Sequence, residues 1–215
     1  MSPPLKGDAN GIYRVHLVGN SGACAMRATR KIVYLFAAQG PARRSTLGAE
    51  LAAILDVPFI SLDTLYWKPN WQTSTADELQ ANLERALAES PRGWVVDGNY
   101  VHLVGDVLER AQTDVIWLAP PLALYLPRLC VRTFLRLVRA RPPCSPGCEE
   151  RAREVFSRDS IVWLCVSQHW RKRRRYGQQM GVQGVQVGGT MRRLGGWGAE
   201  QRAWVQSVRD MVRAA

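Results

Sequence analysis

The chain has 215 residues and a net charge of +11, and 47% of its residues are hydrophobic. This composition supplies enough apolar surface for a packed core and excludes a chain that is disordered throughout. The length suits a single domain, or a single domain with a lid. The longest apolar run, residues 115–126, is shorter than a bilayer requires and contains two prolines, so we expect no membrane span.

Basic residues are concentrated in the C-terminal part of the chain. Residues 1–127 contain 11 Lys and Arg against 12 Asp and Glu, whereas residues 128–215 contain 18 against 6. This asymmetry indicates a polyanionic partner. Charge alone leaves both nucleotide phosphates and nucleic acid open as that partner.

The N-terminal segment and the cysteines favour a cytosolic protein with reduced thiols. Residues 1–13 show neither an apolar nor an Arg-rich targeting pattern, and we expect them to be disordered. The five cysteines are an odd number, and Cys144 and Cys148 have no second close pair that would complete a zinc site.

Strands and helices are predicted to alternate in the first part of the chain. Short β-branched runs mark the strands, and apolar residues at steps of three and four mark the helices. Gly19, Asp63 and Asp97 are expected at the ends of the first three strands. In chain order we predict a strand at 14–18, a helix at 45–55, a strand at 57–62, a helix at 75–89 opened by Ser74 or Thr75, a strand at 94–96, a helix at 101–110 and a strand at 115–118.

The remaining chain is predicted to be more helical. A long helix at 122–138 is followed by a Pro- and Gly-rich segment, and a helix at 159–170 runs into RKRRRY, which we interpret as a solvated helix end. A fifth strand at 185–187, a loop at 188–198 and a helix at 199–212 complete the pattern. The alternation predicts a three-layer α/β fold, in which helices flank a parallel sheet of about five strands and ligands bind at the carboxyl ends of the strands.

A phosphate-binding loop begins after the first strand but is interrupted. Such a loop needs glycines whose backbone N–H groups surround the phosphates, a Lys that reaches the outer phosphates and a Ser or Thr that holds magnesium. The motif G-x-x-x-x-G-K-[ST] starts at Gly19 and fails at residues 24–26, where CAM replaces its second half. Suitable chemistry resumes at residues 44–47, and removal of residues 24–42 would leave GNSGARRSTLGAELA.

Four segments in one order give the chain a specific resemblance. VHLVGNSGA, LDTLYWKPNW, WVVDGNY and FSRDSIVW follow one another as in adenylate-kinase-like P-loop proteins. The chain resembles the group labelled DNA topology modulation protein or cytidylate/adenylate-kinase-like. The resemblance implies a P-loop nucleoside-kinase-like domain over residues 14–215, with an insertion at 24–43 and a basic helical lid with a lid-like segment at 139–158. It also implies ATP and Mg2+ as cofactors.

Two explanations of residues 24–43 remain open. Their mixed character and their position inside one motif favour an unremoved intron in the gene model, in which case the protein itself has an intact loop. A genuine insertion would leave Arg44 where Lys is required, and a planar guanidinium presents its charge differently from a compact ammonium. Nucleotide would then bind weakly or not at all.

The resemblance assigns nucleotide and metal contacts to both halves of the interrupted loop and to a strand end. Asp97 corresponds to an acid that orders magnesium through water and serves catalysis, and Ser45 corresponds to the metal-binding hydroxyl. The implied nucleotide-binding residues are Gly19, Asn20, Ser21, Gly22, Ala23, Arg44, Ser45 and Thr46.

The implied acceptor-binding residues follow the second and third strands. Asp63 is a candidate substrate carboxylate, although a strand-end Asp is also a common cap of a turn. Trp67 and Asn70 have two interpretations, as contacts to an acceptor base or as parts of a plain core and turn. Asn99 is assigned to the acceptor, with capping of the following helix as the alternative.

Arginines recur along the predicted helix at 122–138. Such a stripe is usually a solvated helix face, but a helix that enters a lid is also where nucleotide kinases place arginines that neutralise the transferred phosphoryl group. From the resemblance we assign Arg132, Arg136 and Arg158 to electrostatic catalysis. The stripe itself consists of Arg128, Arg132, Arg136 and Arg139.

The predicted function is ATP-dependent transfer of a phosphoryl group to a nucleoside monophosphate or another small-molecule acceptor. Two alternatives are kept. The basic C-terminal part fits a nucleic-acid-binding protein, although no nucleic-acid-binding motif is present. The interruption fits a degenerate P-loop protein that no longer binds nucleotide. The sequence names neither the acceptor nor the oligomeric state.

Overall fold

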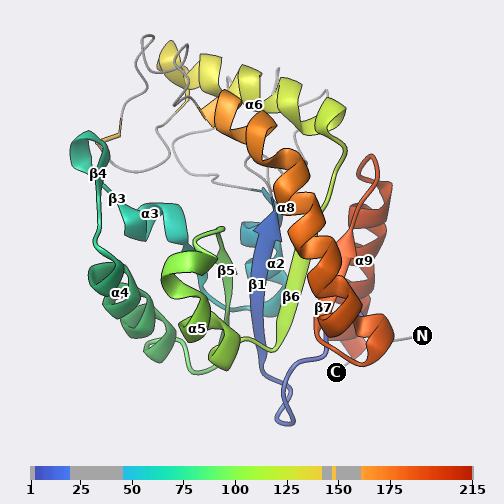
Figure 1. Ribbon diagram of the computed structural model, residues 1–215. Coiled ribbons are helices and arrows are strands. Elements are labelled where there is room, and N and C mark those ends of the chain that lie inside the picture. The colour runs from blue at the N-terminus through green and yellow to red at the C-terminus, as the bar shows by residue number, and fades with distance from the viewer. Residues whose placement is uncertain (1–2, 20–45, 142–146, 149–160, 215) are drawn as a thin grey trace.

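The computed structural model describes residues 3–19, 46–141, 147–148 and 161–214 (Figure 1). Its centre is a five-stranded sheet in the order β2-β5-β1-β6-β7, and every neighbouring pair of strands is parallel. The strands are β1 (Tyr13–Gly19), β2 (Phe59–Ser61), β5 (Gly93–Asp97), β6 (Asp114–Leu118) and β7 (Met191–Leu194).

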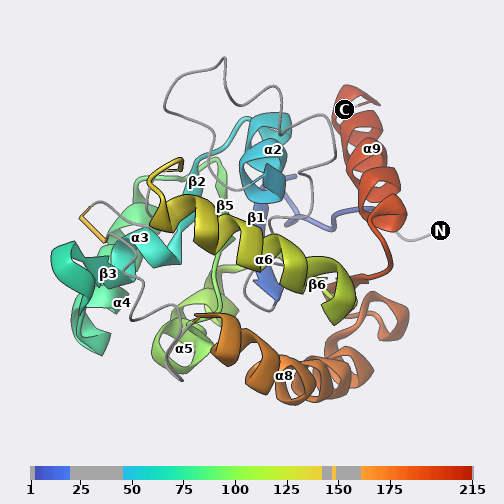
Figure 2. The ribbon, with the colours of Figure 1, turned by 90° about the horizontal axis from the view of Figure 1, so that it is seen from above.

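Helices cover both faces of this sheet. α2 and α9 pack on one face, whereas α3, α4, α5 and α8 cover the other. α6 crosses above the carboxyl ends of the strands (Figure 2). The predicted three-layer α/β fold, a parallel sheet of five strands flanked by helices, is confirmed. The helices are α2 (Thr46–Leu55), α3 (Leu62–Tyr66), α4 (Ala76–Ala88), α5 (Val101–Ala111), α6 (Leu122–Leu137), α8 (Ile161–Gln183) and α9 (Ala199–Ala214).

The central strand β1 is buried on both faces. Successive side chains of a strand point to opposite faces, so a sheet between two helical layers is apolar on both sides. Val15 and Leu17 lie in the cluster that α2 and α9 close, whereas Val18 lies in the cluster that contains Tyr176 of α8. This double burial explains the short β-branched run by which β1 was predicted.

α4 begins where the sequence predicts a helix start. The Thr75 hydroxyl accepts from the Glu78 amide at 3.2 Å, and the Glu78 carboxylate accepts from the Thr75 amide at 3.0 Å. This capping box satisfies two backbone donors that have no partner inside the helix. Of the two predicted caps, Thr75 is therefore correct, because the buried Ser74 hydroxyl instead donates to the Leu65 carbonyl.

The predicted fifth strand is wrong in position. Residues 185–187 form a short 3-10 turn, η3 (Val185–Val187), and the fifth strand is β7, which lies in the segment predicted to be a loop. In β7 the apolar positions Met191 and Leu194 are buried, and two arginines separate them. Arg193 lies over the Trp117 ring, with its guanidinium carbon 5.4 Å from the ring centroid. The arginines interrupt the apolar pattern, because Arg192 donates to the Pro3 carbonyl and Arg193 lies over an aromatic ring.

The prediction that the basic sequence RKRRRY ends a helix is wrong. α8 continues through it to Gln183 and stops before Gly184. His169 and Tyr176 are buried on one side of α8, at helical spacing, while Trp170, Arg171 and Arg174 remain exposed. The helix therefore continues because its packed side continues beneath the charges.

The prediction of disorder over residues 1–13 is wrong for residues 3–13, the last of which already belongs to β1. Leu5 is buried in the cluster with α2 and α9, and the Trp204 indole donates to the Pro4 carbonyl at 3.0 Å. The buried Asp114 carboxylate accepts from the Lys6 amide at 2.7 Å and from the Gly7 amide at 3.0 Å. These contacts join residues that are far apart in the sequence, so the N-terminal segment by itself shows no pattern that would predict them.

None of the helices within the described residues combines the length and the apolar character that crossing a membrane requires.

The two amides on Asp114 give a test of how the N-terminal segment is held. In Asp114→Asn one acceptor oxygen becomes an NH2 group that cannot accept from a backbone amide. We expect the free energy of unfolding to fall by about 2 kcal/mol, as is typical when a buried polar group loses its partner. Urea denaturation measures this change. Asp106→Asn, at an exposed position of α5, is the control, and an equal loss in both variants would contradict the proposed anchoring.

Candidate functional site

Three strand ends meet at one edge of the sheet, beneath α6. In the register of the sheet Asp97 of β5 lies opposite Leu17 of β1 on one side and opposite Ser61 of β2 on the other. Gly19 is the last residue of β1 and lies at the same edge (Figure 1). The structure thus brings together Gly19 and Asp97, as the sequence predicted.

The second half of the interrupted motif also resumes at this edge. α2 begins at Thr46, and a Cβ atom added to Gly48 would collide with the Phe59 ring and lie 3.2 Å from Leu17. Gly48 therefore lets the first turn of α2 approach β1 and β2 closely. The side chain of Thr46 is not described. The other predicted nucleotide-binding residues, Asn20, Ser21, Gly22, Ala23, Arg44 and Ser45, lie outside the described residues, as does the predicted insertion at 24–43.

Asn99 connects the ends of β1 and β5. Its side-chain NH2 group donates to the Gly19 carbonyl at 2.9 Å, and its Oδ1 accepts a hydrogen bond from the Tyr176 hydroxyl of α8. The predicted alternative, in which Asn99 caps α5, is wrong, because the N-cap residue of α5 is Tyr100 and no side chain caps it. The Asn99 side chain instead joins the end of β1 to α8.

His16 forms a second connection between the same two strands. Its Nε2 lies 3.0 Å from the Gly98 carbonyl, and its Nδ1 lies 3.2 Å from Oε1 of Gln112. Burial lowers the pKa of His16 below its usual value. The neutral ring carries one proton, so it donates from either Nε2 or Nδ1. His16 and Tyr176 were not predicted as site residues, since neither belongs to a local motif.

Asp63 lies beside an aromatic cluster on the β2 side of the site. Asp63 was predicted at a strand end. This position is wrong, because β2 ends at Ser61 and Asp63 lies in the first turn of α3. Its carboxylate accepts from the Tyr100 hydroxyl at 2.8 Å, and burial together with this neighbouring charge raises the pKa of Tyr100. Tyr66 packs on Tyr100 and on Trp67, with ring centroids 4.6 and 4.9 Å apart.

Asn70 belongs to a small hairpin. β3 (Trp67–Lys68) and β4 (Gln72–Thr73) are antiparallel and are joined by the turn η2 (Pro69–Trp71). Asn70 has a φ of 60°, the left-handed region that Asn tolerates better than most residues. This conformation supports the turn interpretation of Asn70, whose side chain is exposed.

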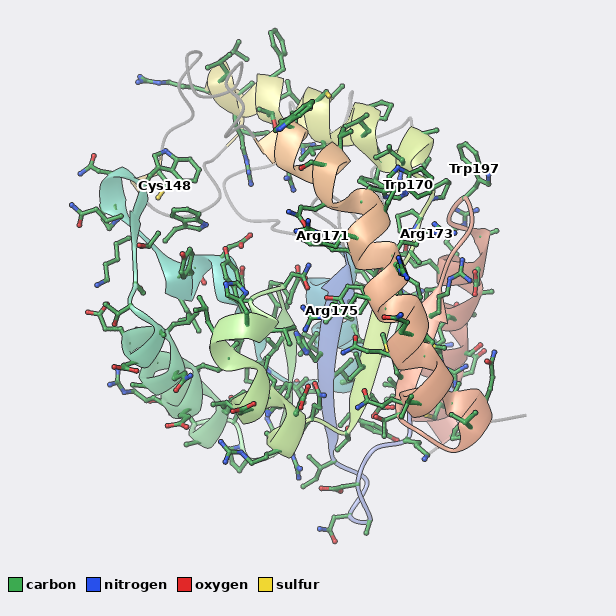
Figure 3. The ribbon with its side chains drawn as sticks, in the orientation of Figure 1. Cys148, Trp170, Arg171, Arg173, Arg175 and Trp197 are labelled. Carbon is green, nitrogen blue, oxygen red and sulfur yellow. The ribbon has the colours of Figure 1, made fainter. Side chains whose placement is uncertain are left out.

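Two residues in the middle of the predicted lid-like segment, Gly147 and Cys148, contact this hairpin. The Gly147 carbonyl accepts from the Asn70 amide at 3.0 Å, and the buried Cys148 thiol donates to the Lys68 carbonyl at 3.2 Å. Figure 3 shows Cys148 beside the hairpin. Within the segment predicted at 139–158, residues 142–146 and 149–158, including Arg158, lie outside the described residues.

The arginines of α6 are not on its solvated side. Arg128, Arg132 and Arg136 are half-buried, whereas Val131 and Phe134 of α6 are exposed. Arg139, the fourth residue of the predicted stripe, lies beyond the end of α6 and is exposed. A stripe that only served solubility would show the reverse arrangement. α6 lies above the strand ends (Figure 2), so Arg132 and Arg136 belong to the helix that faces Gly19 and Asp97.

α8 adds further positive charge to the surroundings of the site. Figure 3 shows Arg171 and Arg175 projecting from α8 to the side on which α3 and α5 lie, whereas Arg173 projects to the side of β7. Arg171 and Arg175 are exposed. Positive charge around a pocket raises the local concentration of anions.

No three or more His, Cys, Asp or Glu side chains gather into a possible metal site within the part of the chain that the structure describes. The magnesium contact expected at Asp97 does not require such a cluster, because Mg2+ is usually held by one or two carboxylates together with waters and substrate phosphates.

Comparison with known proteins gives little beyond this geometry. No family model matches the chain, and no curated protein matches it. Among solved structures, shikimate kinase from Bacteroides thetaiotaomicron is similar, with 17% sequence identity over 94% of this chain and 96% of that chain and a TM-score of 0.42. A likeness this distant carries no conclusion about family or activity.

The buried His16 gives a pH dependence that can be measured. The folded chain holds its pKa below the ordinary value of 6.5, so the unfolded chain binds more protons below that pH. The contribution of neutral His16 to the stability of the fold is therefore fully present above about pH 6.5 and is lost as the pH falls. Urea denaturation at about pH 7.5 and about pH 5 should show a smaller loss of stability in His16→Gln than in the wild type.

His102→Gln is the matched control, because His102 is exposed on α5. It should keep the pH dependence of the wild type. His169, whose pKa is also lowered by burial, contributes equally in all three proteins. A wild-type slope in His16→Gln would contradict the account.

Proposed function

We propose that this protein is an ATP-dependent phosphotransferase of the P-loop nucleotide-kinase type, which transfers a phosphoryl group to a nucleoside monophosphate or another small-molecule acceptor. The observation that carries the proposal is the position of Gly19. It ends the doubly buried central strand, lies at the same edge as Asp97, and is bonded to β5 through Asn99.

This edge suits a triphosphate for physical reasons. The carboxyl end of a central parallel strand followed by a helix N-terminus offers backbone N–H groups and a favourable dipole for phosphates. α2 begins at this edge, with Gly48 against β1 and β2. Asp97, half-buried at the tip of β5, has the carboxylate chemistry that orders the waters of Mg2+. Magnesium neutralises the charge of the phosphates when it is bound.

The acceptor would bind between this edge and the aromatic cluster. Tyr66, Trp67 and Tyr100 form a surface beside Asp63 on which a planar base can stack while the carboxylate accepts hydrogen bonds. Arg132 and Arg136 of α6 would neutralise the transferred phosphoryl group from above, together with Arg158. Positioning and charge neutralisation are the main requirements of such a transfer.

Residues 24–43 decide whether this polypeptide is active. An intact loop after removal of the insertion supports full activity, whereas a genuine insertion, with Arg44 in place of Lys, favours a degenerate protein that binds nucleotide weakly. The chain with its full sequence (the written chain) and a variant without residues 24–42 (the shortened chain) are therefore both tested.

Thermal unfolding with and without Mg-ATP tests the proposal. A ligand that binds only the folded state raises the melting temperature, so we expect an increase of several degrees for the chain without residues 24–42. Asp97→Asn in that chain should lose the part of the increase that depends on Mg2+ and lower phosphoryl transfer by about 100-fold or more, the usual scale for a lost electrostatic contact in catalysis.

Glu84→Gln, at an exposed position of α4, is the control and should behave as the parent chain. If Mg-ATP stabilised neither the written chain nor the shortened chain, the phosphotransferase proposal would be wrong. An increase in the shortened chain alone would identify the written chain as the degenerate form.

A second candidate function, nucleic-acid binding, has one observation in its favour. α8 exposes Arg171, Arg174 and Arg175 together with Trp170, whose side chain is 71% exposed and is labelled in Figure 3. Basic and aromatic side chains on one surface are typical of proteins that bind single-stranded nucleic acid.

The salt dependence of oligonucleotide binding tests this second candidate. If α8 contacts phosphates, replacing Arg171, Arg174 and Arg175 by Gln should reduce the slope of log K against log salt by about 0.7–0.9 for each lost contact. Arg85→Gln with Arg110→Gln removes charge from α4 and α5 and is the control. Binding with no salt dependence would remove the electrostatic basis of this candidate.

A further inference from the structure

We propose that Tyr176 is a positioning residue for nucleotide binding, because its hydroxyl fixes the Asn99 side chain that holds the Gly19 carbonyl. This inference rests on the proposed function and adds a residue that no motif of the sequence contains. The two hydrogen bonds join α8, the end of β5 and the end of β1, which are 77 and 80 residues apart along the chain.

The direction of both hydrogen bonds is determined by chemistry. The Gly19 carbonyl can only accept, so the NH2 group of Asn99 must face it and Oδ1 must face Tyr176. Oδ1 can only accept, so the Tyr176 hydroxyl must donate. Burial raises the pKa of Tyr176 to about 12, which keeps the hydroxyl protonated at neutral pH.

The ring of Tyr176 is held independently of its hydroxyl. The residue is 5% exposed, and its ring lies 5.6 Å from the Trp117 ring, centroid to centroid, in a cluster with Val18 and Met191. Because these contacts are made by ring carbons, a phenylalanine at position 176 keeps them. The hydroxyl can therefore be removed while α8 remains packed on the sheet.

The orientation of Gly19 matters because a peptide group is planar. Fixing its carbonyl direction also fixes the plane of the peptide bond through which the chain leaves β1. Glycine has no Cβ and therefore has more backbone conformations available than other residues. A hydrogen bond to its carbonyl restricts these conformations. The bond between His16 and Gly98 holds β5 from a second position and does not act on Gly19.

The consequence for Tyr176→Phe follows from these contacts. Oδ1 of Asn99 loses its donor, and the carboxamide is no longer fixed at that end. Nucleotide binding to a less ordered Gly19 should weaken, while the groups on the acceptor side, such as Asp63 and Trp67, are unaffected.

Isothermal titration calorimetry and steady-state kinetics on Tyr176→Phe test this inference in the chain that binds Mg-ATP. We expect the Kd for Mg-ATP to rise about three- to tenfold, the scale of one hydrogen bond. The KM for the acceptor and kcat at saturating nucleotide should stay within about twofold of the parent values.

Tyr125→Phe is a matched control. Tyr125 of α6 is also a buried tyrosine, and its hydroxyl lies 2.6 Å from Nδ1 of His169 on α8, so its removal costs a similar hydrogen bond between two helices. Its hydroxyl lies against His169 and not against Asn99, so Tyr125→Phe should change the melting temperature without changing the Kd for Mg-ATP.

A double-mutant cycle separates positioning from a general loss of stability. If Tyr176 acts through Asn99, the Kd of Asn99→Ala combined with Tyr176→Phe should equal that of Asn99→Ala alone. Additive effects, or an unchanged Kd in Tyr176→Phe while the parent chain binds Mg-ATP, would overturn the positioning role alone. A parent chain that does not bind Mg-ATP would overturn the proposed function and the positioning role together.

Discussion

The parallel pairing of β1 with β5 is the constraint on which the site depends. Because the register places Leu17 opposite Asp97, Gly19 and the polar residues 97–99 must leave the sheet at one edge. Backbone groups at such an edge need partners, and His16 and Asn99 supply them for Gly98 and Gly19. The same bonds that satisfy the ends of the strands therefore also give the site its shape.

The fold was predictable wherever burial left a regular pattern. β1, β5 and β6 contain mostly apolar residues because helices cover both faces, and Thr75 and Glu78 mark the start of α4. The errors arose where charged residues occupy packed elements. Arginines interrupt the apolar pattern of β7 and cover one side of α8. The segment of β7 was therefore predicted to be a loop, and the helix α8 was predicted to end too early.

The candidate site was predictable only in its local parts. The strand-end positions of Gly19 and Asp97 follow from sequence patterns, because a motif and a register are enough to place them. Tyr176 and His16 could not be found in this way. Their roles depend on contacts across about 80 residues or more of chain, which only the packing of α8 and β5 on β1 creates.

A crystal structure of the shortened chain with Mg2+ and a non-hydrolysable ATP analogue tests the central claim most directly. The account predicts the triphosphate at the carboxyl end of β1, between Gly19 and the start of α2, with Asp97 hydrogen-bonded to water on the metal and Asn99 still bonded to the Gly19 carbonyl. A triphosphate bound elsewhere, with Gly19 and Asp97 remote from it, would contradict the account.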